Sequence, residues 1–430
     1  MRYLRKLKHI ASFEVVFVFF LFAGQYKTSP AFDFVPVDIT ALMFGVSVLT
    51  GGWVILKRGI EFDRKATILT ILLGVFVWYG LLSLGWTPST VYAQEKGLFL
   101  VTLTIWPFLV FAHIIGLNPQ RLRRFIVVLL LFSGWIATVS LLVYVTGSAP
   151  GGQQISAFGR DAGYIGLGRI VGLGALVALM YALRLSESRL YRWISGGIFA
   201  LYMFLLLVIG SRAAFVATAV PAVFPLLVGV RWQRLEVIAF DRYVIPYFVG
   251  AIIGVSAVTF LFRSEALSTL SRLAYLIRTG GESQPRFELW AQTLSIWGEN
   301  PLFGVGLAGW PIKAGFGDHL MYPHNMILEI MAELGVVGLI LFGLFAGYAL
   351  MVFRTRNNLR MNAMALLILM LLANTFLNAM STGDIPQNRI VFGMIGLLLF
   401  KSDSRAESGI ESEDETASLS PKTPSPNPSR

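Results

Sequence analysis

Long apolar segments, each bounded by polar or charged residues, recur along the whole chain. Most have about 20 residues, the length of a helix that crosses a hydrocarbon core of about 30 Å. Twelve such segments predict an all-α polytopic membrane protein, with spans near 10–25, 37–56, 66–86, 97–116, 125–146, 164–184, 192–210, 213–230, 243–262, 325–352, 361–380 and 388–401. A transmembrane β-barrel would alternate apolar and polar residues over segments of about 10 residues, and the sequence shows no such alternation.

The positions of the basic residues predict the orientation. Cytoplasmic loops of membrane proteins carry an excess of Lys and Arg. Every second loop is basic, with clusters around Arg2–Lys8, Lys57–Lys65, Arg121–Arg124, Arg184–Arg192, Arg231–Arg242 and Arg354–Arg360. The short loops between them hold few basic residues, namely Lys27, Lys96, Arg160, Arg212 and Arg389. Both termini are therefore expected in the cytoplasm.

One outer loop is much longer than the others. The expected organisation is nine spans in 1–262, the outer loop in 263–324, three spans in 325–401 and a disordered cytoplasmic tail in 402–430, rich in Ser, Pro and acidic residues. Within the loop, segments 264–279 and 286–298 read as amphipathic helices at the membrane surface. A long loop that carries its own helices is more often functional than a simple connection.

Composition supports the membrane interpretation. Of the 430 residues, 56% are hydrophobic and 14% are charged, against roughly 25% charged in a typical soluble domain. The net charge of +11 could indicate nucleic-acid binding in a soluble protein, but here the basic clusters follow the predicted topology. The chain has no cysteine, which excludes disulfides and thiolate metal sites.

Five informative polar residues fall on the predicted outer side: Arg212, Arg286, His324, Asp384 and Arg389. Arg212 lies between two apolar spans, where it is either an interfacial arginine that extends to water or an anion clamp. Arg286 begins a predicted helix, where a cation opposes the helix dipole. An anionic ligand would explain it, and so would a salt bridge to Glu282 or Glu288.

His324 lies where the long loop meets the next span. It is flanked by Pro323 and by Asn325, a plausible N-cap. Imidazole near neutral pH can act as a base or donate to phosphate, although a lone histidine is usually structural. Glu329 and Glu333 follow within the span, where ionisable groups normally face a cavity or a partner.

Two further segments carry candidate chemistry. The glycines of 300–311 (NPLFGVGLAGWP) could let backbone approach a phosphate. The segment is no nucleotide-binding P-loop, because no Gly-Lys-Ser/Thr follows. Asp384 and Arg389 in STGDIPQNR are either an ion pair or a carboxylate and a third arginine at the outer site.

The segments RFELWAQTLSIWGENPLFGVGL and PHNMILEIMAELGVVG together resemble the O-antigen ligase/polymerase superfamily. The specific part of this resemblance covers residues 286–340. It implies a GT-C-like, inverting glycosyltransferase that needs no metal or other cofactor and lies in the bacterial inner membrane. The expected donor is a glycan on undecaprenyl diphosphate at the periplasmic face, and the expected acceptor of a ligase is lipid A–core oligosaccharide. A polymerase would instead extend another lipid-linked glycan.

The resemblance also implies roles for individual residues. His324, Arg212 and Arg286 match the essential residues of the family, with His324 either a base or a diphosphate ligand. Substrate-binding roles are expected for Asn325, Glu333, Asp384 and Arg389. The Gly383-Asp384 and Arg389 pattern resembles the ligases and favours ligase over polymerase. A polysaccharide transporter remains the alternative of another class, and it should carry functional polar groups throughout the membrane depth rather than one outer cluster.

Overall fold

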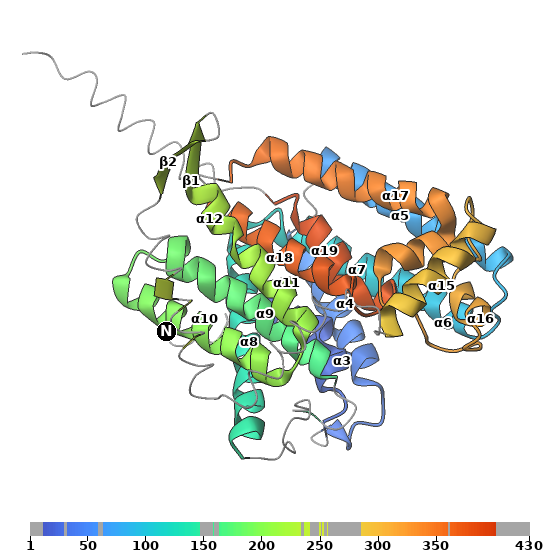
Figure 1. Cartoon of the computed structure of the whole chain (residues 1–430), viewed down its shortest axis with the longest axis horizontal. Helices are drawn as coiled ribbons and strands as arrows, with labels where there is room; N and C mark the ends of the chain where they lie inside the picture. Colours follow the sequence, from blue (N-terminus) through green and yellow to red (C-terminus); the bar gives the residue numbers. More distant parts are fainter. Residues whose placement is uncertain are drawn as a thin grey trace, which may run out of the picture.

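The computed structural model describes residues 12–29, 32–58, 63–146, 158, 163–233, 236–240, 249–250, 252, 256, 285–359 and 362–400. These residues are predominantly helical, and their only strands form an antiparallel hairpin of β1 (Val230–Gln233) and β2 (Glu236–Phe240). Figure 1 shows the helices gathered into one bundle with this hairpin at its edge.

The α-helices in chain order are α2 (Phe13–Leu21), α3 (Ala23–Tyr26), α4 (Ile39–Arg58), α5 (Arg64–Leu82), α6 (Tyr92–Phe99), α7 (Ile105–Leu109), α8 (Pro119–Val145), α9 (Tyr164–Met180), α10 (Arg189–Ile209), α11 (Arg212–Ala222), α12 (Phe224–Gly229), α15 (Pro285–Glu299), α16 (Gly309–Lys313), α17 (Met326–Arg356), α18 (Ala363–Ala379) and α19 (Arg389–Leu397). Short 3₁₀ turns are η2 (Ser83–Gly85) and η6 (Pro386–Asn388). The π-helical segments are η3 (Leu100–Thr104), η4 (Val110–Ile115) and η5 (Tyr181–Leu185).

Eight helical segments in the described part of the chain are long and apolar enough to cross a membrane. They are Ile39–Lys57, Arg64–Gly85, Tyr92–Ile115, Pro119–Val145, Tyr164–Leu185, Arg189–Ile209, Arg212–Gly229 and Met326–Arg356. The prediction of an all-α polytopic membrane protein is confirmed. The count of twelve stays a prediction, because almost all of the expected span 243–262 lies outside the described residues, as does the loop helix 264–279.

Local sequence signals set several helix boundaries. Asp and Asn side chains accept hydrogen bonds from the first free backbone N–H groups of a helix. Among the described residues they do so at the starts of five helices, with Asp38, Asp63, Asn118, Asn325 and Asn362 as caps. A tight turn separates α10 from α11, where Gly210 has a φ of 80°; the expected spans 192–210 and 213–230 require such a turn. The predicted loop helix 286–298 is also confirmed as α15.

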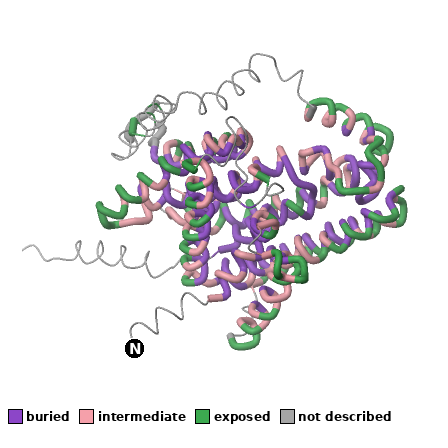
Figure 2. Tube along the Cα trace, turned by 90° about the horizontal axis from the view of Figure 1, so that it is seen from below, coloured by how far each residue is buried: buried purple, intermediate pink, exposed green. Residues whose placement is uncertain are grey.

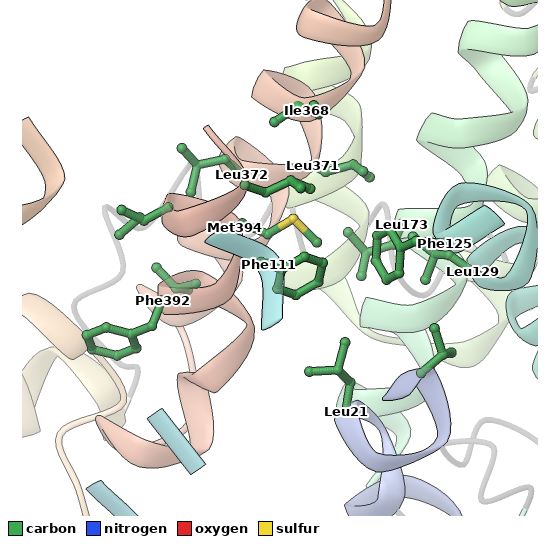
Figure 3. Close-up of a cluster of buried hydrophobic side chains, with 14 of the residues drawn as sticks. Leu21, Phe111, Phe125, Leu129, Leu173, Ile368, Leu371, Leu372, Phe392 and Met394 are labelled. Atoms are coloured by element: carbon green, nitrogen blue, oxygen red, sulfur yellow. The ribbon is translucent and has the colours of Figure 1, made fainter. Parts of the chain in front are cut away.

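Helix α9 packs against α8, α10, α11 and α18, and most of its residues are buried. Figure 2 shows that buried residues make up the interior of the bundle. The glycines of α9 allow the neighbouring helices to approach closely. A Cβ at Gly172 would overlap the Thr218 hydroxyl of α11, and one at Gly174 would overlap Ser133 of α8. Figure 3 shows the apolar packing nearby, where Phe111 and Phe125 form an edge-to-face pair with ring centroids 4.9 Å apart.

Helix α17 is broken at Gly335, which has φ 64° and ψ −165°. Such a break leaves backbone groups without helical partners, and in an apolar environment each unsatisfied group is costly. The loop 301–306 supplies the missing partners. Its Val305 and Gly306 N–H groups donate to the Ala332 and Glu333 carbonyls at 2.9 Å, while Val336 N–H donates to the Pro301 carbonyl and Val337 N–H to the Leu302 carbonyl.

The glycines of segment 300–311 allow the loop backbone to approach α17 and Thr87 closely. A Cβ at Gly304 would lie 2.4 Å from the Glu333 carbonyl, and one at Gly306 would lie 2.7 Å from the Thr87 Cα. The expectation that these glycines bring backbone close to a phosphate is therefore wrong for these two positions. Their missing side chains make room for protein backbone instead.

The loop is also tied to the start of α6. Asp318 accepts hydrogen bonds from the Ser89 hydroxyl and from the backbone N–H groups of Thr90, Val91 and Tyr92. The Ser89 hydroxyl and these amides hold the pKa of the Asp318 carboxyl well below its usual range. Asp318 thus caps α6 from a position more than 200 residues later in the chain, which ties the long loop to the start of α6.

Replacing Gly335 with alanine should destabilise the protein. The backbone conformation at Gly335 is essentially restricted to glycine, and forcing another residue into it costs about 1–3 kcal/mol. The new Cβ would also lie 2.3 Å from the Leu302 carbonyl oxygen. We expect Gly335→Ala to lower the midpoint of thermal unfolding in detergent clearly.

Gly343→Ala is the matched control. Gly343 lies in the same helix with nothing within 4 Å of its ideal Cβ, so alanine there should be neutral or stabilising by about 0.5–1 kcal/mol. Equal unfolding midpoints for the two variants would show that the break at Gly335 is not required.

Candidate functional site

His324 lies in the turn that leads from the outer loop into α17. Its φ of 58° places it in the left-handed region, which is unusual for a residue other than glycine. Two neighbours hold it there. The Trp290 indole N–H donates to the Pro323 carbonyl at 2.9 Å, and the Asn325 side chain caps α17. Asn325 is therefore the N-cap that the sequence predicted, and its side-chain oxygen is occupied by backbone N–H groups.

Arg286 lies in the first turn of α15, four residues before Trp290 and on the same helical face. The bond from Trp290 to Pro323 therefore brings Arg286 towards His324. Among the described residues, Arg286 forms no salt bridge, so the expected pair with Glu288 is absent, and Glu282 lies outside this part of the chain.

The surroundings of His324 favour its neutral form. Burial lowers the pKa of the His324 imidazole, and the positive charge of Arg286 lowers it further. The buried Nδ1 atom of His324 has no hydrogen-bond partner within the described part of the chain. A neutral imidazole with an unpartnered nitrogen can accept a proton.

Tyr322 packs against His324, with ring centroids 4.7 Å apart in an edge-to-face arrangement. Burial raises the pKa of the Tyr322 phenol, which stays protonated at neutral pH. The charges of Arg169, Glu329 and Asp384 all act on this phenol. Tyr322 therefore is in ring contact with His324 and within electrostatic range of these charged groups.

Arg212 is the first residue of α11 and is partly buried. The preceding Ser211 lies against α9, since a Cβ at Gly168 would be 3.0 Å from the Ser211 Cβ. The next residue of α9 is Arg169, the arginine whose charge acts on Tyr322. The structure thus places the start of α11, with Arg212, against the turn of α9 that carries Arg169.

Glu333 is occupied by an ion pair. The Lys96 ammonium of α6 binds the Glu333 carboxylate at 2.7 Å and also binds Glu329. All three side chains are buried. This contact joins the first two turns of α17 to α6 just below His324, so the structure gives Glu333 a positioning contact rather than an open binding position.

Asp384 and Arg389 do not pair with each other. The Tyr92 hydroxyl donates to Asp384 at 2.7 Å, and Arg389 donates to the Leu21 carbonyl at 2.8 Å and to the Phe20 carbonyl. The ion pair offered as one interpretation of the sequence is therefore wrong. Arg389 also lies over the Phe20 ring, and its guanidinium completes the C-terminal end of α2.

Sequence reasoning missed three residues that the structure places around the predicted site: Lys96, Arg169 and Tyr322. Arg169 carried a usable signal, because an arginine within an apolar span normally has a partner. Lys96 was noted only as an outer basic residue, and its two carboxylate partners lie more than 230 residues away. No group of three or more His, Asp or Glu side chains suited to a metal ion occurs among the residues described.

Comparison with known proteins adds a family to this geometry. The model of the O-antigen ligase family matches residues 197–343. Arg212, Arg286 and His324 fall inside the matched segment, whereas Asp384 and Arg389 fall outside it. No curated protein matches the chain. The family match supports a membrane glycosyltransferase of the O-antigen ligase or polymerase type and does not distinguish these two. It supports, over residues 197–343, the resemblance of the chain to the O-antigen ligase/polymerase superfamily.

Proposed function

We propose that the protein is an O-antigen ligase. It would transfer a glycan from undecaprenyl diphosphate to lipid A–core oligosaccharide at the periplasmic face of the inner membrane, with both termini in the cytoplasm and no metal ion. The observation that carries the proposal is the half-buried His324, inside the matched segment and at the end of the long loop, where burial and the charge of Arg286 lower the pKa of its imidazole.

The reaction is a single displacement at the anomeric carbon, which inverts its configuration. The acceptor hydroxyl forms the new C–O bond while the bond to the diphosphate breaks, and the hydroxyl proton passes to His324. Arginine side chains suit the departing diphosphate, because their paired donors and fixed charge stabilise the developing negative charge. Arg286 and Arg212 are the candidates for this role.

The environment of His324 favours the base role over the diphosphate-ligand role. A ligand for diphosphate would act best as an imidazolium, and both burial and Arg286 disfavour that form by lowering the pKa. An unprotonated imidazole is what a general base requires. Asn325 and Glu333 would then act by positioning, since the one caps α17 and the other binds Lys96.

A polymerase that extends undecaprenyl-linked glycan would use the same base and the same cations. The ligase proposal rests on the resemblance of Gly383, Asp384 and Arg389 to the ligase pattern. Because Asp384 accepts from Tyr92 and Arg389 binds α2, that pattern would support the fold around the site rather than contact the diphosphate. Acceptor choice therefore needs a direct test.

Purified protein should transfer glycan to lipid A–core in the presence of EDTA. The reaction contains undecaprenyl-diphosphate glycan and both acceptors, and products are resolved on a gel. A glycan ladder on lipid A–core supports the ligase. Elongation of the undecaprenyl-linked glycan alone would identify a polymerase, and movement of intact lipid-linked glycan across proteoliposomes without transfer would identify a transporter.

Replacing His324 with alanine should lower the transfer rate by roughly 10²–10⁴-fold, the usual contribution of a general base. His319→Ala is the matched control, because His319 lies in the same loop and is exposed. It should keep normal activity and abundance. Equal activity of the two variants would remove His324 from the mechanism.

The pH profile of transfer should reflect the lowered pKa of His324. Activity that needs the neutral imidazole should persist as the pH falls below 6.5, the ordinary histidine value, and be lost only at lower pH. Arg286→Ala removes one of the two causes of the lowered pKa, so its acidic limb should move up towards 6.5. An acidic limb that does not move in Arg286→Ala would show that Arg286 does not act on the base.

A further inference from the structure

We propose that Asn374 is a positioning residue of the transfer site: it supplies the hydrogen bond that Pro221 removes from α11 and thereby holds the helix that begins with Arg212. This inference rests on the proposed function, in which Arg212 is a candidate cation for the departing diphosphate. Asn374 lies in α18, outside the segment 197–343 that the family model matches.

Helix α11 contains a proline that leaves one backbone carbonyl without its helical donor. In an α-helix each N–H donates to the carbonyl four residues earlier. Pro221 lies inside α11 and has no N–H, so the Ala217 carbonyl cannot receive this bond. Ala217 is buried. An unsatisfied carbonyl at this position would be costly, because the hydrocarbon core of a membrane offers no water to bind it.

Asn374 of α18 supplies the missing donor. Its side-chain nitrogen donates to the Ala217 carbonyl and to the Thr218 hydroxyl, both at 3.1 Å. The Thr218 hydroxyl donates in turn to the Ala214 carbonyl at 2.7 Å. Asn374 is 1% exposed, and polar side chains in an apolar bundle usually bind a neighbouring helix in this way. Both hydrogens of the Asn374 amide therefore bind α11.

The orientation of the Asn374 amide is set within α18. The side-chain nitrogen of Asn378, one turn later, donates to the Asn374 side-chain oxygen at 3.2 Å and to the Asn374 carbonyl at 2.9 Å. This bond occupies the side-chain oxygen of Asn374 and leaves its nitrogen for α11. The amide is therefore arranged as a donor to the carbonyl that lacks one.

Helix α9 packs against both α11 and α18, and Figure 1 shows the three helices side by side. A Cβ at Gly172 of α9 would lie 2.3 Å from the Thr218 hydroxyl oxygen, so α9 closely covers this contact. Arg169 of α9 also donates to the Asn378 carbonyl at 3.0 Å and to the Thr382 carbonyl at 2.7 Å. Helix α18 is thus bound to α9 and gives α11 a fixed support.

The bonded part of α11 lies close to Arg212. Arg212 is the first residue of the helix, and Ala217 follows five residues later, about 7–8 Å along the axis at 1.5 Å per residue. A movement of this short helix would therefore displace the Arg212 backbone as well. Arginine binds diphosphate through paired donors in a fixed geometry, and a misplacement of about 1 Å can cost about 10²-fold in rate.

The test combines Asn374→Leu with Pro221→Ala. Asn374→Leu removes the amide and keeps a buried side chain of similar size. Pro221→Ala restores an N–H that can donate to the Ala217 carbonyl, so the amide is no longer needed there. The two single variants and the double variant are compared with the unchanged protein in detergent. The measured quantities are kcat and KM of transfer and the rate at which phenylglyoxal modifies Arg212, followed by mass spectrometry.

We expect Asn374→Leu to lower kcat/KM for the donor by about 10- to 100-fold, the effect of a misplaced binding group, with little change in the acceptor KM. Arg212 is partly buried and should be modified several times faster, because α11 loses its bond to α18. Pro221→Ala alone should change neither quantity. The double variant should recover much of both, because α11 then supplies its own donor.

Asn362→Ala is the matched control for loss of an asparagine from α18. Asn362 caps the start of this helix by accepting from the Ala365 N–H at 3.0 Å. Its replacement should lower the unfolding midpoint, as loss of an N-cap does. It should leave the donor kinetics and the modification rate of Arg212 unchanged, with or without Pro221→Ala.

Two results would overturn the proposal. Equal losses from Asn374→Leu with and without Pro221→Ala would show that Asn374 does not replace the missing donor. A lower unfolding midpoint in Asn374→Leu, with unchanged donor kinetics and unchanged modification of Arg212, would show that the contact is structural only.

Two further outcomes remain decisive. If Asn374→Leu does not fold, recovery of folded protein in the double variant supports the proposal, and a lack of recovery contradicts it. If the unchanged protein transfers no glycan, the proposed function fails. The modification rate of Arg212 does not depend on transfer, and it still decides whether Asn374 holds α11 in place.

Discussion

The need to satisfy backbone hydrogen bonds away from water governs the end of the bundle that carries the candidate site. Helix α17 is interrupted at Gly335, and the loop 301–306 donates to and accepts from the groups that the interruption leaves free. In a hydrocarbon environment irregular backbone is tolerated only where protein supplies such partners. His324 lies just before α17, against which the loop docks, so this docking helps to place the turn that carries the candidate base. The site is therefore built on backbone pairing more than on side-chain packing.

Buried charged side chains also hold the helices together, and each of the buried cations binds a different part of the bundle. Lys96 joins α6 to the half of α17 that precedes the break, through Glu329 and Glu333. Arg389 completes the end of α2. Breaking such a buried interaction is costly, since removing one partner leaves an uncompensated buried charge. Arg286 differs from them, because no salt bridge occupies it among the described residues and its charge acts on His324. The proposed division between structural and reactive cations follows from these contacts.

The candidate site could be predicted from the sequence only in part. His324, Asn325 and Arg286 could be identified from the sequence, because a neighbouring proline, a helix-capping residue and a helix start are local sequence signals. Their mutual approach was not, since it depends on the Trp290 bond to Pro323 across more than 30 residues. Asp384 and Glu333 look like free acidic groups in the sequence. In the structure Tyr92 and Lys96 occupy them. The glycines of 300–311 suggested a phosphate loop, because a close approach of backbone leaves the same signature whatever approaches it.

The sequence by itself determined that the chain is a helical membrane protein. The length and apolarity of each segment are local properties, and they decide whether a helix can cross the hydrocarbon core. The sequence also determined the turn at Gly210 and the caps of several helices, which depend on neighbouring residues only. The tertiary structure alone decided which polar groups are paired, which carbonyls Arg169 binds and which histidine nitrogen lacks a partner. Those outcomes depend on groups far apart in the chain, and hydrogen bonds and ion pairs form only where folding brings donor and acceptor within about 3 Å.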